Sequence, residues 1–199
     1  SVPLNHKLGR LGSKSIMISF KNYVTEQEPK GALLLTGTIG SGKTTVAIEI
    51  GHQLEAKNLR CAVIDLDWLG WVCLGDKFYY HDRLIFQNLF SLWPNLHSVG
   101  VEYLILARGV TQREPVETLR RVWPGTPLTV VRLLASSRTL KQRLTHRDVG
   151  QTLQEHLGEV DIMTETLDRL KLEQATVMNE GHSITEVARQ VITVTGWVE

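Results

Sequence analysis

The chain of 199 residues is long enough for one domain with a sizeable core, and its 42% hydrophobic and 22% charged residues are ordinary for a globular protein. A formal net charge of +1, with acids and bases interspersed, argues against a nucleic-acid partner, which would require clustered Lys and Arg. No apolar run approaches the ~20 residues of a membrane helix. Two cysteines, Cys61 and Cys73, cannot form a disulfide framework, so we predict reduced thiols in a cytoplasmic protein that acts as a monomer or homodimer without a membrane partner.

The first 30 residues are mixed and polar, and we interpret them as a partly ordered leader with one short element at Ile16–Phe20. The domain is expected over residues 31–199. There, short apolar runs alternate with longer amphipathic segments, a pattern typical of βαβ units and a parallel sheet. Strands buried on both faces are nearly continuous apolar runs, and five segments fit: Ala32–Thr36, Cys61–Leu66, Glu102–Ala107, Leu128–Leu134 and Ala175–Met178.

Helices are predicted between these strands. The last one is the clearest, because Ser183 and Glu186 form a capping box ahead of an apolar stripe. The helix that begins at Asp82 should break near Pro94, and a break is also expected around residues 148–150. The other predicted helices are Lys43–Lys57, Asp82–Leu96, Glu114–Trp123, Arg138–Arg147 and Thr152–Glu173. Together these elements predict a three-layer α/β/α P-loop fold with a five-stranded parallel sheet.

A phosphate-binding loop follows the first strand. Gly37, Gly42, Lys43 and Thr44 match the pattern of Gly, four free positions, Gly, Lys and Ser or Thr. Glycines let backbone N–H groups converge on phosphates, and the helix N-terminus favours the same anion. Lys43 would reach the β- and γ-phosphates and Thr44 would offer its hydroxyl to Mg²⁺. The expected nucleotide-binding residues of this loop are Gly37, Thr38, Ile39, Gly40, Ser41, Gly42, Lys43, Thr44 and Thr45.

Two carboxylates, Asp65 and Asp67, stand at the end of the second strand. Residues two apart point to the same side of a strand, so both were expected to face the γ-phosphate and an acceptor. One of them would hold Mg²⁺ and the other would accept a proton from a hydroxyl nucleophile. The third strand ends without an acid and is followed by Arg108, which either faces an anionic acceptor or pairs with an acid at the sheet edge.

Arginines recur on the segment that follows the fourth strand. Arg138, Arg143 and Arg147 are spaced along a predicted helix that runs into a polar turn. An Arg on a mobile segment over the phosphates would neutralise charge on the transferred group and exclude water as it closes. The alternative is a solvated basic helix face.

These motifs resemble those of the small P-loop kinases, the group that includes adenylylsulfate kinase, shikimate and gluconate kinases and chloramphenicol phosphotransferase. The resemblance covers nearly all of residues 31–195. It implies that Asp65 serves the metal and that Asp67 binds the acceptor, as the second-strand acids of shikimate kinase do. It also implies that Arg143 and Arg147, in "TLKQRLTHRD", lie near the nucleotide and its phosphates.

The same resemblance implies further contacts. "HDRLIFQNL" is similar to the helix that lines the acceptor pocket of adenylylsulfate kinase, so Arg83 and Asn88 are expected there, and Asn179 belongs to a turn similar to the one that touches adenine. The sequence departs from the group where Asp67 is followed by "WLGW", and no acceptor of a named kinase carries over. Trp68 and Trp71 would form an aromatic rim suited to a planar or sugar-like molecule, or else a satellite hydrophobic cluster.

The sequence thus predicts an ATP- and Mg²⁺-dependent kinase that phosphorylates a hydroxyl of a small molecule. Catalysis is expected from Lys43, Asp65, Asp67, Arg143 and Arg147, and acceptor binding from Asp67, Trp68, Trp71, Arg83, Asn88 and Arg108. The alternative is a regulatory or scaffold protein that binds a nucleotide without transferring phosphate. A kinase requires an open cavity beside the loop that both Asp67 and an arginine can reach, whereas a regulator would have this cavity filled.

Overall fold

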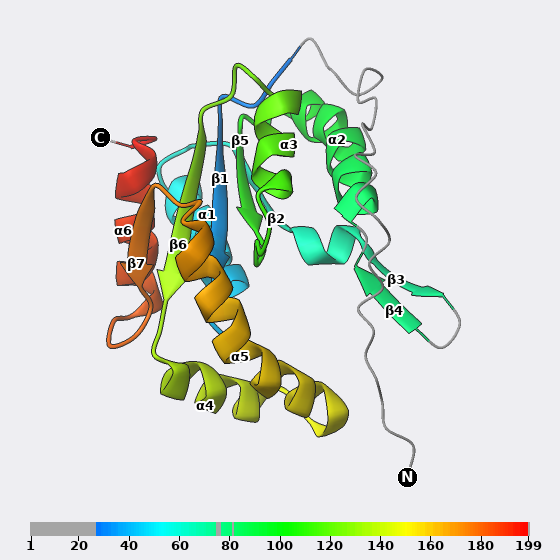
Figure 1. Cartoon of the computed structure of the whole chain (residues 1–199). Helices are drawn as coiled ribbons and strands as arrows, with labels where there is room; N and C mark the ends of the chain where they lie inside the picture. Colours follow the sequence, from blue (N-terminus) through cyan, green and yellow to red (C-terminus); the bar gives the residue numbers. More distant parts are fainter. Residues whose placement is uncertain (1–26, 75–76, 81, 199) are drawn as a thin grey trace.

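A computed structural model describes residues 27–74, 77–80 and 82–198. Its centre is a five-stranded sheet with the strand order β2-β5-β1-β6-β7, in which every neighbouring pair is parallel (Figure 1). The strands are β1 (Gly31–Gly37), β2 (Cys61–Asp65), β5 (Tyr103–Ala107), β6 (Leu128–Leu134) and β7 (Ala175–Met178). The five strands predicted from apolar runs are confirmed, each to within one residue at either end.

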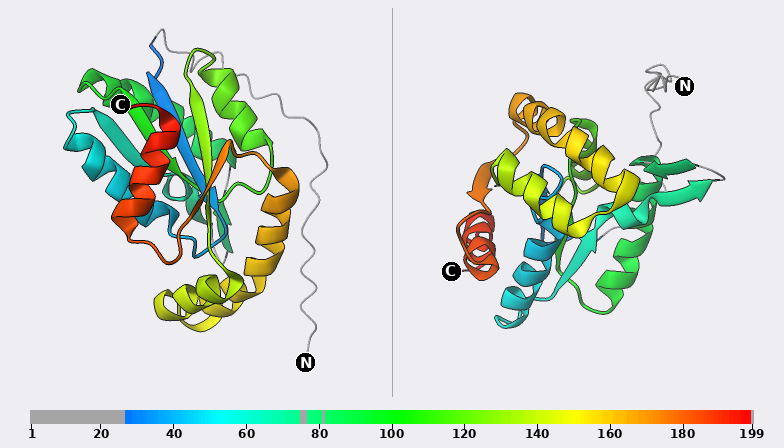
Figure 2. Two further views of the ribbon diagram at one scale, coloured as in Figure 1. Left: turned by 90° about the vertical axis from the view of Figure 1, so that its left-hand side faces the viewer. Right: turned by 90° about the horizontal axis from the view of Figure 1, so that it is seen from below.

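The two faces of the central strand feed two separate cores. Leu33 and Leu35 pack with α1 (Lys43–Glu55) and α6 (Ile184–Thr195), whereas Leu34 packs with α2 (Asp82–Ser98) and α3 (Glu114–Val122). All three leucines are fully buried, which explains why β1 has a continuous apolar sequence rather than an alternating one. The two views of Figure 2 show the resulting three layers. The predicted fold class is confirmed.

Two further helices, α4 (Ser137–Arg147) and α5 (Gly150–Leu170), lie side by side at the C-terminal end of the sheet (Figures 1 and 2). The predicted break between them is confirmed, since the chain is extended at Asp148 and Val149. Within the described residues, no helix is long and apolar enough to cross a membrane.

The break predicted near Pro94 is wrong, because α2 runs through this proline to Ser98, two residues beyond the predicted end at Leu96. Proline removes one backbone hydrogen bond and usually costs ~3 kcal/mol inside a helix. Here Pro94 itself is exposed, while Trp93 beside it is 1% exposed and its ring packs edge-on against Trp123. Burial of this apolar face stabilises the turn that proline weakens.

A β-hairpin was missed between the second strand and α2, where the sequence was interpreted as a loop. β3 (Trp71–Leu74) pairs antiparallel with β4 (Lys77–Tyr80), and Trp71 stands opposite Tyr80. A 3-10 helix, Leu66–Leu69, connects β2 to this hairpin. In Figure 1 the hairpin projects from the body of the domain beside the start of α2.

Residues 27–30 lead into β1 and are fixed by contacts with two loops and a helix. Gln27 O accepts a hydrogen bond from Trp93 Nε1 at 2.8 Å, and the Glu28 carboxylate accepts one from Gly125 N at 2.7 Å. The element predicted at Ile16–Phe20 lies outside the described residues, so the division of the chain at residue 30 stays a prediction.

Candidate active site

The phosphate-binding loop connects β1 to α1 and depends on glycines with positive φ. Gly37, Gly40 and Gly42 have φ values of +146°, +80° and +86°, a region that L-residues with a side chain rarely adopt. A Cβ atom on Gly37 would also lie 2.7 Å from Ser41 Oγ and from the Leu133 carbonyl. The loop thereby ends at the N-terminus of α1, where unpaired backbone N–H groups and the helix dipole favour an anion.

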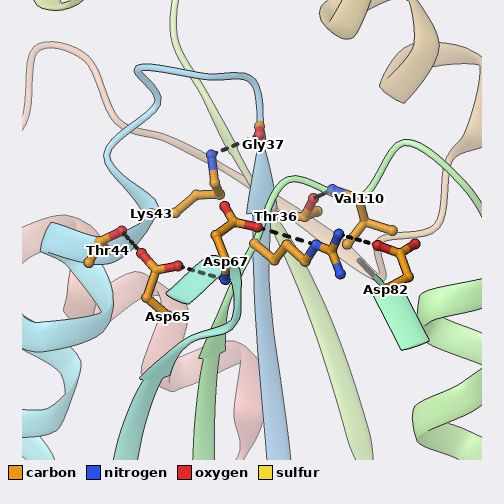
Figure 3. Close-up of polar contacts among 9 residues, drawn as sticks. Thr36, Gly37, Lys43, Thr44, Asp65, Asp67, Asp82 and Val110 are labelled. Atoms are coloured by element: carbon orange, nitrogen blue, oxygen red, sulfur yellow. Dashed lines mark hydrogen bonds and ion pairs between the residues drawn. The ribbon is translucent and has the colours of Figure 1, made fainter. Parts of the chain in front are cut away.

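Lys43, the first residue of α1, folds back over this loop. Its Nζ donates hydrogen bonds to the Gly37 carbonyl at 3.1 Å (Figure 3) and to the Thr38 carbonyl at 3.3 Å. Burial lowers the pKa of Lys43 from 10.5 to about 8, and the nearby carboxylates of Asp67 and Asp65 limit the fall. An ammonium group held this way is poorly solvated and would gain from an incoming phosphate.

Thr44 and Asp65 form an oxygen-rich pair next to the lysine. Thr44 Oγ1 donates a hydrogen bond to Asp65 Oδ2 at 2.6 Å, while Asp65 Oδ1 accepts one from the Asp67 backbone N–H at 3.1 Å (Figure 3). Asp65 therefore caps the 3-10 helix and faces the loop at the same time. A hydroxyl and a carboxylate are the type of ligands that Mg²⁺ takes, so this pair fits a magnesium site.

The expectation that Asp65 and Asp67 share one side of a strand is wrong. β2 ends at Asp65, and Asp67 lies in the first turn of the 3-10 helix. The Asp67 side chain still reaches the site, where its Oδ1 lies 3.4 Å from Arg108 Nε. Burial raises the pKa of Asp67, and the Arg108 guanidinium opposes this rise. A carboxylate with a raised pKa beside a phosphate site suits a general base.

Arg108 pairs with acids at the end of the sheet, the second of the two alternatives that the sequence left open. Besides Asp67, it contacts Asp82 at the start of α2, with 2.5 Å between Nη2 and Oδ1. Arg108 is 9% exposed, and its Nη1 is buried without a hydrogen-bond partner among the described residues. Thr36 accepts a hydrogen bond from the Val110 N–H at 3.1 Å, which fixes the turn that follows Arg108 (Figure 3).

Arg143 and Asn179 brace the loop from outside. Asn179 is 5% exposed and donates from Nδ2 to the Ser41 carbonyl at 2.7 Å. Arg143 donates to the carbonyls of Asn179 at 2.6 Å and Gly40 at 3.5 Å. Arg143 therefore lies next to the phosphate-binding loop, and its predicted role over the transferred group stays a prediction.

Arg147 lies beside the phosphate-binding loop, and its role in closing over the transferred group stays a prediction. It lies at the end of α4 and forms a two-bond ion pair with Asp148, at 2.7 and 3.0 Å. The same carboxylate contacts His156 Nδ1 of α5 at 2.6 Å. Arg147 holds the pKa of Asp148 low, at about 2. Sequence reasoning missed Asp148 and His156, since the histidine had no recognisable spacing and only the packing of α4 against α5 joins them.

One cleft of about 370 Å³ lies beside the phosphate-binding loop. Larger grooves lie over the outer edge of β2 and beside β7, but neither contains a residue of the phosphate loop. The cleft therefore brings together a lysine and an arginine, a hydroxyl–carboxylate pair and a second carboxylate. Its lining residues are Ile39, Gly40, Gly42, Lys43, Thr44, Thr45, Asp65, Asp67, Ala107, Arg147 and His156.

Apart from Asp67, the predicted acceptor residues lie outside the lining of this cleft, on the 3-10 helix, β3, α2 and the turn after β5. Trp68 and Trp71 are 68% and 41% exposed, and their ring centroids are 4.8 Å apart. Asn88 donates to the Leu69 carbonyl at 2.6 Å, so it supports the 3-10 helix. Arg83 is exposed on the first turn of α2. Of the predicted acceptor residues, only Asp67 lines the cleft itself.

Comparison with known proteins agrees with this architecture. No family model matches the chain, and no curated protein matches it in sequence. Among solved structures, a gluconokinase from Sinorhizobium meliloti matches with a TM-score of 0.56 at 20% identity over 85% of this chain and 94% of its own. The tunicamycin resistance protein of Deinococcus radiodurans matches with a TM-score of 0.60 at 17% identity, over 85% and 97% of the two chains.

A third similar structure is the APS kinase of Mycobacterium tuberculosis in complex with AMPPNP and APS. Its TM-score is 0.55 at 22% identity, over 84% of this chain and 98% of the kinase. At such identities the likeness is one of fold. The chain has the fold of the small P-loop kinases, as its loop and strand motifs predicted.

Proposed function

We propose that the protein is a phosphotransferase that moves the γ-phosphate of ATP to a hydroxyl group of a small molecule. The observation that carries this proposal is the shared cleft, in which Lys43, Asp67 and Arg147 face the phosphate-binding loop from three different elements. Phosphoryl transfer to a hydroxyl is helped by cations that offset the charge of the phosphates and by a carboxylate that accepts the hydroxyl proton. A protein that only senses a nucleotide needs no second carboxylate in this cleft besides the one that holds the metal.

ATP and Mg²⁺ are assigned to the loop side of the cleft. The backbone of residues 37–45 would hold the triphosphate, and Lys43 would exchange its two carbonyl partners for phosphate oxygens. Thr44 and Asp65 would hold Mg²⁺ because their oxygens already lie 2.6 Å apart. When bound, Mg²⁺ offsets negative charge on the phosphates. This division leaves Asp67 for the acceptor, as the family resemblance implied.

Asp67 is assigned as the group that orients and deprotonates the acceptor. The acceptor oxygen forms a bond to the γ-phosphorus while the bond from that phosphorus to the bridging oxygen breaks. The hydroxyl proton passes to Asp67, and ADP leaves with the electron pair of the broken bond. Arg147, held by Asp148, would lie against the transferred group and neutralise its charge.

The test is mass spectrometry of small molecules incubated with the protein, ATP and Mg²⁺. The panel would contain nucleosides, sugars, sulfated nucleotides and hydroxylated antibiotics. We expect a phosphoryl mass gain on one class of acceptor, absent with Lys43→Ala and retained with Lys57→Ala, a matched change of an exposed lysine beyond the end of α1. ATP binding without any mass gain across the panel would contradict the proposal and favour a nucleotide-sensing protein.

A further inference from the structure

The cation on the acceptor side of the site, Arg108, is buried and paired with carboxylates. Arg108 is 9% exposed and its guanidinium contacts Asp67 at 3.4 Å and Asp82 at 2.5 Å. The guanidinium atom without a partner among the described residues, Nη1, is buried and does not face solvent. An anionic acceptor would therefore meet the two carboxylates before it could reach Arg108.

The two carboxylates beside Arg108 are exposed to an acceptor. The side chains of Asp67 and Asp82 are 45% and 46% exposed although both contact the same guanidinium. One positive charge faces two negative ones, so the group of three carries one net negative charge. Arg83 follows Asp82 in α2 and is exposed, but adjacent residues of a helix do not point the same way.

Two exposed tryptophans follow Asp67 along the chain. Trp68 directly follows Asp67 in the 3-10 helix, and Trp71 begins the hairpin. Their rings lie 4.8 Å apart at an interplanar angle of 45°, and both are exposed by more than 40%. Aromatic faces attract cations and pack against the C–H faces of ring compounds. The segment after β2 thus carries one exposed carboxylate and two exposed aromatic rings, and Asp82 adds a second carboxylate at the same guanidinium.

We propose that the acceptor is an alcohol that also carries an ammonium group, such as an aminosugar or an aminocyclitol. This inference rests on the proposed function and specifies its substrate class. The ammonium group would pair with Asp82, the ring would pack on Trp68, and one hydroxyl would reach Asp67. An acidic sugar would be repelled by the same carboxylates.

Binding can be measured apart from transfer. Ligand-observed NMR with the protein, Mg²⁺ and AMPPNP would compare glucosamine, glucose and glucuronate, three sugars of one size, with kanamycin as a larger aminoglycoside. At about pH 6.5, where the amines are charged, we expect the amine-bearing probes to bind at least about tenfold more tightly than glucose, and glucuronate to bind most weakly. Equal binding of the three sugars, tighter binding of glucuronate, or no binding of either amine would overturn the inference.

Two substitutions test separately the contribution of the Asp82 charge and that of the Trp68 ring to acceptor binding. Asp82→Asn should reduce the preference for glucosamine over glucose by about three- to tenfold, because Arg108 then loses one of its carboxylates. Trp68→Ala should weaken both sugars without changing their ratio. Glu117→Gln, at an exposed position of α3, removes the same charge elsewhere and should leave the ratio unchanged. An unchanged ratio in Asp82→Asn would overturn the role of that carboxylate.

The two proposals fail differently. If amines bind selectively but no probe gains a phosphoryl group, the inference about the surface holds while the proposed transfer is contradicted. If phosphate is transferred to glucuronate and not to glucosamine or kanamycin, the protein is a kinase and the inferred substrate class is wrong.

Discussion

Lys43 is expected to take up a proton when ATP binds near pH 8. In the structure its pKa is lowered to about 8 by burial. A triphosphate placed against Nζ would add several negative charges within contact distance and raise this pKa again. The protein should therefore bind ATP in its protonated form and draw a proton from the buffer whenever the free lysine is neutral.

The size of the effect follows from the pKa. With a value of about 8, Lys43 is about 10% neutral at pH 7, about half neutral at pH 8 and about 90% neutral at pH 9. If the pKa in the complex lies above 9, uptake at pH 8 is about half a proton per ATP. The same populations predict a fall in ATP affinity of about tenfold between pH 7 and pH 9, equivalent to about 1.4 kcal/mol.

Isothermal titration calorimetry checks this prediction. The heat of binding of ATP with Mg²⁺ would be measured at pH 8 in buffers of different ionisation enthalpy, and the slope gives the number of protons taken up. Lys57→Ala should retain the uptake, since that lysine lies outside the site. A slope of zero at pH 8 and at pH 9, with the affinity unchanged, would refute the reasoning.

The lowered pKa also sets the sign of a stability change. Between pH 8 and the unfolded value of 10.5, the unfolded chain binds more protons at Lys43 than the folded chain does. The contribution of Lys43 to the free energy of unfolding therefore rises with pH across this window, and below pH 8 the buried charge is a constant cost of at most about 3 kcal/mol. Lys43→Met should accordingly unfold at a higher temperature than the unchanged protein at pH 7 without nucleotide, as scanning calorimetry would measure.

Three substitutions test other parts of the site. Asp67→Asn should lower turnover by about 100-fold or more while ATP affinity, measured by calorimetry, stays nearly constant; full turnover would remove Asp67 from the role of base. Gly42→Ala places a Cβ atom 2.6 Å from Asn179 Nδ2 at a φ of +86° and should cost about 1–3 kcal/mol in urea unfolding. Asp148→Asn releases Arg147 and should lower kcat about 10- to 100-fold with a smaller change in the KM for ATP, whereas an equal effect on both would contradict a role in transfer.

The fold could be predicted because its strands carry a strong signal. β1 and its neighbours are buried on both faces, so their sequences are apolar without interruption, and glycine, lysine and threonine mark the loop that follows. The capping box at Ser183 is present in the structure, with Glu186 and Ser183 bonded to each other's backbone N–H groups. These features depend only on residues that are close in sequence, so they can be recognised from one sequence alone.

Errors arose where distant residues decide the local structure. Pro94 remains helical because Trp93 is packed against α3 and the residues that follow it, a contact about 30 positions away in sequence. Arg143 donates to the backbone carbonyls of Gly40 and Asn179, and the pattern of side chains in a sequence does not show which carbonyls are available as acceptors. The hairpin of β3 and β4 was missed since its four-residue strands carry too short an alternation to stand out from an aromatic loop.

The third predicted strand, β5, ends without an acid, and the sheet register explains why. In the sheet register Asp65 lies opposite Ala107, so the β2 carboxylate occupies the level at which a third-strand acid would stand. The small side chain of Ala107 leaves room for the bond between Asp65 and Thr44. Because β2 supplies the carboxylate at this level, the residue that follows β5 can be Arg108, which pairs with Asp67 and Asp82. Asp65→Ala alone should lose Mg²⁺-dependent ATP binding. The double variant Ala107→Asp with Asp65→Ala, which places the carboxylate at the end of β5 instead, should restore this binding.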